Sequence, residues 1–302
     1  MKMNERIYKI TFLVLPFLAN MITGCVDSIG PDEIIYPEFI EEEAVTILGY
    51  NSHAMEPFIT KDGNYLFFNS LNDGINTSLY YAQKQDYKTF TFMGEISGVN
   101  GEPPHLDAVA SMDTQNKFYF VSTRNYPTIF ENLQVGQFNN GTVSDVKPVL
   151  GDFYILTAGW LIMDAEINKD GDCLYYVNAK FRGQPLPDES KIGIAVKKDT
   201  LFKKLHNSEG ILQNVNDVTF LVYAPSSSDG KELYFTRIKK GTIITEICVS
   251  VRKDTLEPFS IPNVLQVVGN TPEAVSVTGD KNRIYYHKKD NGTYQIFTMR
   301  RK

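Results

Sequence analysis

Four acidic residues recur at similar points of the sequence, each before a short apolar run that leads into a polar turn and an aromatic-rich run. They are Glu56, Asp107, Asp164 and Glu273. A ring of such carboxylates could bind a cation or a sugar, and two of them could act as the acid and base of a glycosidase. The alternative is structural, with each carboxylate accepting hydrogen bonds from a neighbouring turn. Recurrence favours the structural role, because a catalytic residue has no reason to appear in every repeat.

Three other side chains close to these acids could take part in a site. His53 and His105 precede Glu56 and Asp107, so imidazole and carboxylate groups of adjacent repeats could approach metal-ligand geometry. Neither histidine has the i, i+4 helical spacing of a zinc motif, and a surface or turn-capping role is the stronger interpretation. Trp160 could stack on a sugar or anchor a partner, although core packing is the simpler role. We therefore predict no metal and no cofactor, and treat these residues as candidate ligand-binding positions.

The sequence lacks the motifs of the common nucleophile and nucleotide sites. There is no G-x-S-x-G, P-loop, G-x-G-x-x-G or H-E-x-x-H sequence, and the turn "APSSSDG" has no adjacent histidine. The net charge is −6, and an acidic protein is a poor partner for nucleic acid or for an anionic membrane surface. These observations favour a non-catalytic monomer that binds no nucleic acid, and leave an enzyme as the alternative.

The candidate residues are positioned by a repeated unit. Composition is that of a globular protein, with 42% hydrophobic residues, and the 17 Tyr and 19 Phe favour strands. An apolar–aromatic–aromatic core recurs every 51 to 59 residues, beginning at Leu66, Phe118, Leu174, Leu233 and Ile284. In the first copy the pattern predicts four strands, at 55–60, 64–70, 77–83 and 89–96. Asp-Gly turns of the kind that tight hairpins prefer separate them.

Four-stranded antiparallel units in series predict an all-β fold, a five-bladed β-propeller over residues 43–302. The fifth copy has only three strands of its own, at 274–278, 283–288 and 293–300. The segment "EAVTILGY" (43–50) is a strand without a blade. We expect it to complete the fifth blade as the outer strand and so to close the ring.

The N-terminus has the features of an export signal and a membrane anchor. Residues 1–24 combine a positively charged start with an apolar run too short to span a bilayer, as in a signal peptide. "ITGC" resembles the bacterial lipobox, which implies cleavage before Cys25 and lipid attachment to its sulfur. Residues 25–42 are acidic and interrupted by proline, and predict a flexible tether. By analogy with enterobacterial sorting, Val26 favours the outer membrane, facing the periplasm, with the cell surface as an alternative.

The repeat itself resembles a known family. "EPFITKDGNYLFFNS" (56–70) is similar to the WD40-like repeat of TolB-like bacterial envelope propellers, the PD40 type. The residues that match are Glu56, Pro57, Phe58, Asp62, Gly63, Phe68 and Ser70. The fourth copy departs from the pattern, with Tyr223 in place of the acid, and the third carries an insertion at 181–190. The resemblance implies a blade and little about activity, because that family includes scaffolds, peptidase-associated propellers and glycan-handling proteins.

The two cysteines inside the repeats, Cys173 and Cys248, lie in strand-like runs. Buried, unpaired thiols are the favoured interpretation, and a disulfide is the alternative, since an envelope compartment can be oxidising. Taken together, the sequence predicts a lipid-anchored envelope propeller that acts as a non-catalytic binding or scaffolding module for a protein, cell-wall or glycan partner. The alternative is a glycan-binding or glycan-cleaving protein that uses the four recurring carboxylates. We expect these to ring the mouth of the propeller's central channel, because the first strand of each blade lines that channel.

Overall fold

A computed structural model describes residues 34–267, 269 and 271–302 of the chain. The predicted signal segment 1–24, Cys25 and the tether as far as residue 33 lie outside the described residues. Ile34–Lys302 form one compact unit. No helix in that described part is long and apolar enough to cross a membrane.

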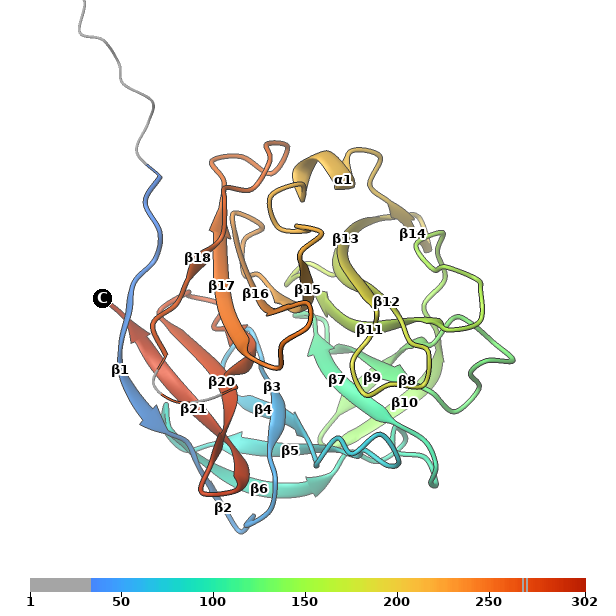
Figure 1. Cartoon of the computed structure of the whole chain (residues 1–302). Helices are drawn as coiled ribbons and strands as arrows, with labels where there is room; N and C mark the ends of the chain where they lie inside the picture. Colours follow the sequence, from blue (N-terminus) through green and yellow to red (C-terminus); the bar gives the residue numbers. More distant parts are fainter. Residues whose placement is uncertain (1–33, 268, 270) are drawn as a thin grey trace, which may run out of the picture. The chain divides into compact units, whose positions relative to one another are not determined.

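The unit is a five-bladed β-propeller of small antiparallel sheets, which confirms the predicted fold class (Figure 1). Blade one contains β3 (Met55–Ile59), β4 (Tyr65–Asn69), β5 (Leu79–Lys84) and β6 (Thr89–Glu95). Blade two contains β7 (Asp107–Met112), β8 (Lys117–Ser122), β9 (Leu133–Asn139) and β10 (Thr142–Pro148). Blade three contains β11 (Trp160–Ile167), β12 (Cys173–Lys180), β13 (Glu189–Lys198) and β14 (Leu201–Lys204).

The last two blades follow the same order. Blade four contains β15 (Phe220–Ser226), β16 (Glu232–Lys239), β17 (Thr245–Val251) and β18 (Asn263–Val264). Blade five contains β19 (Glu273–Val277), β20 (Arg283–Asp290) and β21 (Thr293–Arg301), completed by β1 (Phe39–Ala44). A single helical turn, α1 (Ser208–Ile211), lies between blades three and four in the chain. The first strands of neighbouring blades contact one another, so these five strands surround a central channel.

The ring closes by the predicted device, with a different strand boundary. β1 pairs antiparallel with β21 from Phe39 opposite Arg301 to Ala44 opposite Phe297, and Figure 1 shows β1 beside β21, close to the C-terminus. The closing strand is therefore 39–44, not 43–50, and its first residues belong to the segment expected to be a tether. The chain leaves blade five at Val45, and β2 (Thr46–Leu48) then pairs parallel with β6 as a fifth strand of blade one.

The hydrophobic core consists of five clusters, each between two neighbouring blades. The aromatic second strand supplies both of its faces, because successive side chains of a strand point to opposite sides. In β4, Phe67 packs with Met112 and Phe118 of blade two, whereas Leu66 and Phe68 pack with Tyr285 of blade five. A blade cannot bury both faces alone, so the blades are stable only as a ring.

Cys173 and Cys248 are both free thiols, as favoured from the sequence. Cys248 is fully buried and Cys173 partly so. Burial raises the pKa of Cys173 to about 11 and that of Cys248 to about 12. Neither is therefore a ready nucleophile.

Candidate functional site

The first strand of each blade shifts its register against the second strand at one point. The pairing of β3 with β4 shifts register between Met55 and Phe58, and the corresponding pairings in the other four blades shift at equivalent points. Glu56 and Val109 have left-handed backbone there, with φ of 50° and 56°. A bulge of this kind re-aims a side chain. Glu56 and Val109 line the central cavity, whereas in blades four and five the left-handed residues are Ala224 and Ala274 and the preceding residues, Tyr223 and Glu273, line it.

A cavity of about 400 Å³ occupies the channel at this end of the strands. Its floor includes the side chains of Glu56, Asp164, Tyr223 and Glu273, which come from blades one, three, four and five. Its wall is largely aliphatic, and the lining residues of this kind are Leu106, Val121, Leu161, Met163, Leu221 and Ile238. The volume lies within the range typical of small-molecule sites.

The insertion of blade three lies over this cavity. The loop between β12 and β13 contributes Phe181, Gln184, Pro185, Leu186 and Pro187 to the lining. The insertion is the longest in the repeats, yet the sequence did not indicate which way it folds. It adds apolar surface to one side of the mouth, and Gln184 is its one lining side chain with an amide.

The three carboxyl groups of the floor have polar partners but no cationic ones. The Asn69 side-chain amide donates to Glu56, while its oxygen accepts the Val109 N–H at 3.1 Å and so ties blade one to blade two. The Glu56 N–H donates to Nδ1 of His287 at 3.1 Å. Glu273 accepts from the Tyr223 hydroxyl. No lysine, arginine or histidine lines the cavity in the described part of the chain.

Asp164 is the least satisfied member of this group. It is only 3% exposed and accepts the Ala224 N–H. Its second oxygen, Oδ2, has no hydrogen-bond partner among residues 34–267, 269 and 271–302. A buried carboxylate oxygen without a donor is costly, and such atoms in folded proteins call for an explanation.

The environment favours the neutral form of all three acids. Burial raises the pKa of Glu56 to about 8, and the charges of Asp164 and Glu273 act in the same direction. Burial also raises the pKa of Asp164 and of Glu273 to about 7, despite the hydrogen bonds that each accepts. Behind Glu56, burial lowers the pKa of His287 to about 3, so this imidazole is neutral. At neutral pH the three carboxyl groups are therefore partly protonated and titrate as a coupled group.

The structure brings three of the four predicted acids together and places Asp107 elsewhere. Asp107 is fully buried, with Oδ1 at 2.8 Å from Arg124 Nη2 and Oδ2 at 2.7 Å from the Gly101 N–H. It lies two residues before Val109, which holds the position that Glu56 occupies in blade one. The prediction that Asp107 rings the channel mouth is therefore wrong, and this acid is structural. The degenerate turn of blade two hid the offset.

The other predicted positions also lie apart from the cavity lining. His53 accepts the Tyr294 N–H at Nδ1, 3.2 Å away, between β2 and β3. His105 precedes β7, and its ring lies beside Gly101. Trp160 is partly buried at the start of β11, with Lys180 Nζ 5.5 Å from its ring centroid. In the described residues no group of three or more His, Cys, Asp or Glu side chains could hold a metal ion.

Two buried acids at the opposite, turn end of the strands, Glu166 and Glu232, are paired with cations. Lys61 of blade one and Glu166 of blade three form an ion pair of 2.8 Å, with side chains only 4% and 7% exposed. Glu166 also accepts the Ser227 N–H of blade four at 3.1 Å. This pair joins non-adjacent blades, and we infer that its side chains close the channel at the turn end.

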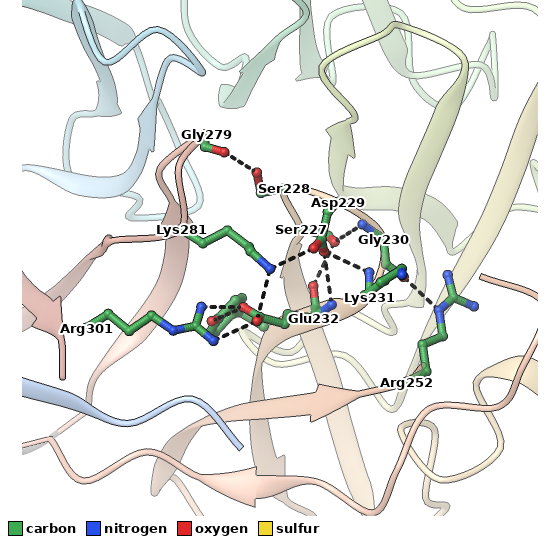
Figure 2. Close-up of polar contacts among 11 residues, drawn as sticks. Ser227, Ser228, Asp229, Gly230, Lys231, Glu232, Arg252, Gly279, Lys281 and Arg301 are labelled. Atoms are coloured by element: carbon green, nitrogen blue, oxygen red, sulfur yellow. Dashed lines mark hydrogen bonds and ion pairs between the residues drawn. The ribbon is translucent and has the colours of Figure 1, made fainter. Parts of the chain in front are cut away.

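The seam between blades four and five repeats this pairing (Figure 2). Arg301 donates twice to Glu232, at 2.8 and 3.0 Å, and Lys281 Nζ lies 2.7 Å from Asp229 and 3.2 Å from Glu232. Burial acts to raise the pKa of Glu232, but hydrogen bonds from Arg301 and Tyr234 lower it on balance. The Asp-Gly turn is thus an architectural feature in blade four, as the repetition of this turn had indicated.

Comparison with known proteins identifies the fold only. No protein-family model matches the chain, and no curated protein matches it in sequence. An endo-arabinase from Bacteroides thetaiotaomicron superposes with a TM-score of 0.52 and 14% identity, over 85% of this chain and 97% of that chain. Zg3597, a family 117 glycoside hydrolase of Zobellia galactanivorans, gives 0.51 and 12%, over 88% and 90%. A TolB candidate from Agrobacterium tumefaciens superposes less well, with a TM-score of 0.47 and 10% identity, over 85% of this chain and 78% of that chain.

Proposed function

We propose that this chain is a lipid-anchored propeller of the bacterial envelope that binds a ligand, or a protruding group of a protein or glycan partner, in its central cavity. Cys25 carries the lipid anchor, the protein is located at the outer membrane, and its blades are of the PD40, TolB-like type. The observation that carries the proposal is the cavity, in which side chains of all five blades and the insertion of blade three converge on one space. The acids Asp107, Glu166 and Glu232 lie outside this lining and are each paired with a base.

The protonation pattern favours binding over catalysis. A glycosidase needs one carboxyl held protonated and another held ionised, so its environments push the two pKa values apart. In this cavity burial moves the pKa of Glu56, Asp164 and Glu273 in the same direction, to between about 7 and 8. None of the three carboxyls is therefore held fully ionised. Partly protonated carboxyls can both donate and accept hydrogen bonds, which suits a ligand with several hydrogen-bonding atoms.

Glycan cleavage is the second candidate, supported by the convergence of these carboxyl groups. A carboxyl with a pKa near neutrality can serve as a general acid. The shared fold with an endo-arabinase and a family 117 glycoside hydrolase adds an analogy of architecture alone.

A cavity-filling variant tests the binding proposal. Ala108 lines the cavity and is 6% exposed, so Ala108→Phe should occupy the space with little change elsewhere. Isothermal titration with a panel of small amines, alcohols and arabino-oligosaccharides should give binding of at least one of these ligands to the wild type and of none to the variant, with matched thermal unfolding. Equal binding by both proteins would refute the cavity as the site. Chromatography of the same mixtures decides the second candidate, because only an enzyme shortens the oligosaccharides.

The anchor has its own test. Cys25→Ala should move the protein from the membrane fraction to the soluble fraction and abolish labelling by a palmitate analogue. Retention on the membrane with unchanged labelling would contradict lipid attachment at this residue.

A further inference from the structure

The charge of the central cavity is unbalanced. Its lining contains three carboxyl groups, the Tyr223 phenol and a few neutral polar side chains, and the described part of the chain contributes no basic residue to it. Elsewhere in the fold, the buried acids Glu166 and Asp107 each have a basic partner, Lys61 and Arg124 respectively. Carboxyl groups that are buried together without a counter-charge destabilise one another when ionised. A cationic ligand would supply the missing charge.

An unsatisfied atom marks where such a charge would lie. Asp164 lines the cavity and is almost fully buried, and its Oδ2 atom lacks a donor among the described residues. The other acids are already committed in part, Glu56 to the Asn69 amide and Glu273 to the Tyr223 hydroxyl. A ligand N–H directed at Asp164 would make a charge-assisted hydrogen bond, which is stronger than a neutral one.

The wall of the cavity limits what else the ligand contains. A bare metal ion does not fit the arrangement, because no three acidic or metal-binding side chains of the described residues are close enough to hold one. The space of about 400 Å³ is also far larger than an ion, and its sides are Leu, Ile, Val and Met side chains. Hydroxyl groups of a sugar ring would face these side chains without partners, at a cost of desolvation. An apolar body suits this wall.

We propose that the cavity binds a small organic cation, with its ammonium group among Glu56, Asp164 and Glu273 and its apolar body against Leu161, Leu221 and Ile238. This inference rests on the proposed binding function and names the chemical class of the ligand. The insertion of blade three completes the apolar side, since Phe181 and Leu186 border the same space.

The titratable groups around the ammonium position make the binding proton-linked. They are Glu56 on β3, Asp164 on β11, Tyr223 on β15 and Glu273 on β19, with His287 on β20 behind Glu56, and β7 contributes none to the lining. Because burial raises the pKa of the three carboxyls, a bound cation displaces protons from them. The affinity for an amine therefore increases with pH from 5.5 to 8.

Isothermal titration with a matched pair of probes tests the proposal. The full chain, purified in a polyoxyethylene detergent, is titrated at pH 8 with cyclohexylmethylamine and with its neutral analogue cyclohexylmethanol. We expect the amine to bind at least about tenfold more tightly than the alcohol, as a charge-assisted contact allows. At pH 5.5, where the amine keeps its charge, the preference should fall to about twofold or less. This arm needs no mutation.

Variants assign the preference to the carboxyl groups. In Glu56→Gln/Asp164→Asn/Glu273→Gln the two probes should bind within about twofold of each other, with the alcohol bound as in the wild type. Asp164→Asn alone should remove part of the preference and serves if the triple variant does not fold. Glu209→Gln, an exposed acid paired with Lys204, is the matched control and should behave as the wild type.

Three outcomes would overturn the inference: equal binding of the two probes to the wild type, a preference that survives in the triple variant, or no binding of either probe. An oligosaccharide titrated in parallel separates this inference from the binding function on which it rests. If the oligosaccharide binds the wild type but not Ala108→Phe, and the amine shows no preference, the binding function stands and the organic cation is wrong. If no ligand binds, both proposals fail.

Discussion

The acids at the two ends of the central channel are chemically alike and differ in their partners. At the turn end, Glu166 is paired with Lys61, and nearby Glu232 is paired with Arg301 at the seam of Figure 2. At the cavity end, Glu56, Asp164 and Glu273 have no cation, and burial raises their pKa. Pairing compensates the charge of a buried acid, whereas an unpaired buried acid destabilises the free protein when it ionises. The difference separates residues that build the propeller from residues with a reason to bind something.

Removing the acid of the most buried pair should have the largest effect. Glu166→Gln leaves the Lys61 ammonium buried without its counter-charge, since that side chain is 4% exposed. We expect the free energy of unfolding to fall by about 3 kcal/mol in denaturant titrations. Lys61→Met/Glu166→Gln, which removes both charges and keeps an acceptor for the Ser227 N–H, should recover most of the loss. A double variant as unstable as the single one would contradict this role of the pair.

Removing Arg301 should have a smaller effect. Glu232 would keep Lys281 and the Tyr234 hydroxyl as partners, and the arginine side chain is 30% exposed. Arg301→Met should therefore lower the free energy of unfolding by about 2 kcal/mol. The adjacent Arg300→Met is the control, because Arg300 pairs with Glu41 at the surface and its removal should leave the free energy of unfolding close to that of the wild type. Equal losses for the two variants would mean that burial does not distinguish the pairs.

Much of this comparison could be predicted from the sequence, because strand alternation and turn residues are local signals. The aromatic cores beginning at Leu66 and Leu174 located the second strands, and the missing strand of the fifth copy indicated how the ring closes. The start of the closing strand was wrong because "FIEEEA" carries four polar or small residues in six and resembles a tether. Only its pairing with β21 makes it a strand.

The candidate site was harder to predict, because it depends on which way a bulge directs one residue. Glu56, Asp164 and Glu273 were found by recurrence, and the same rule wrongly included Asp107. Tyr223 appeared only as a departure from the repeat, although it is the phenol that hydrogen-bonds Glu273. The cavity wall depends on side chains from five blades and an insertion, which no single repeat encodes.

At the cavity the change in stability is expected to have the opposite sign. A carboxyl whose folded-state pKa lies above its unfolded value binds more protons in the folded state, so the free energy of unfolding falls as pH rises between the two values. For Glu56 this window runs from 4.5 to about 8. Glu56→Gln should therefore raise the free energy of unfolding at pH 8.5 and leave it nearly unchanged at pH 4. A lower free energy of unfolding for Glu56→Gln at pH 8.5 would show that the Glu56 carboxylate, like that of Glu166, is compensated by its surroundings.

The direct test is to titrate the cavity carboxyls in the ligand-free protein. Carboxyl carbon-13 NMR of the wild type, compared with Glu56→Gln/Asp164→Asn/Glu273→Gln, isolates the three resonances that the variant lacks. The account predicts apparent pKa values between about 7 and 8 for this group, as expected for acids buried together without a cation. Titration of all three below pH 5 would show that they are solvated or paired, and would contradict the distinction between the two ends of the channel.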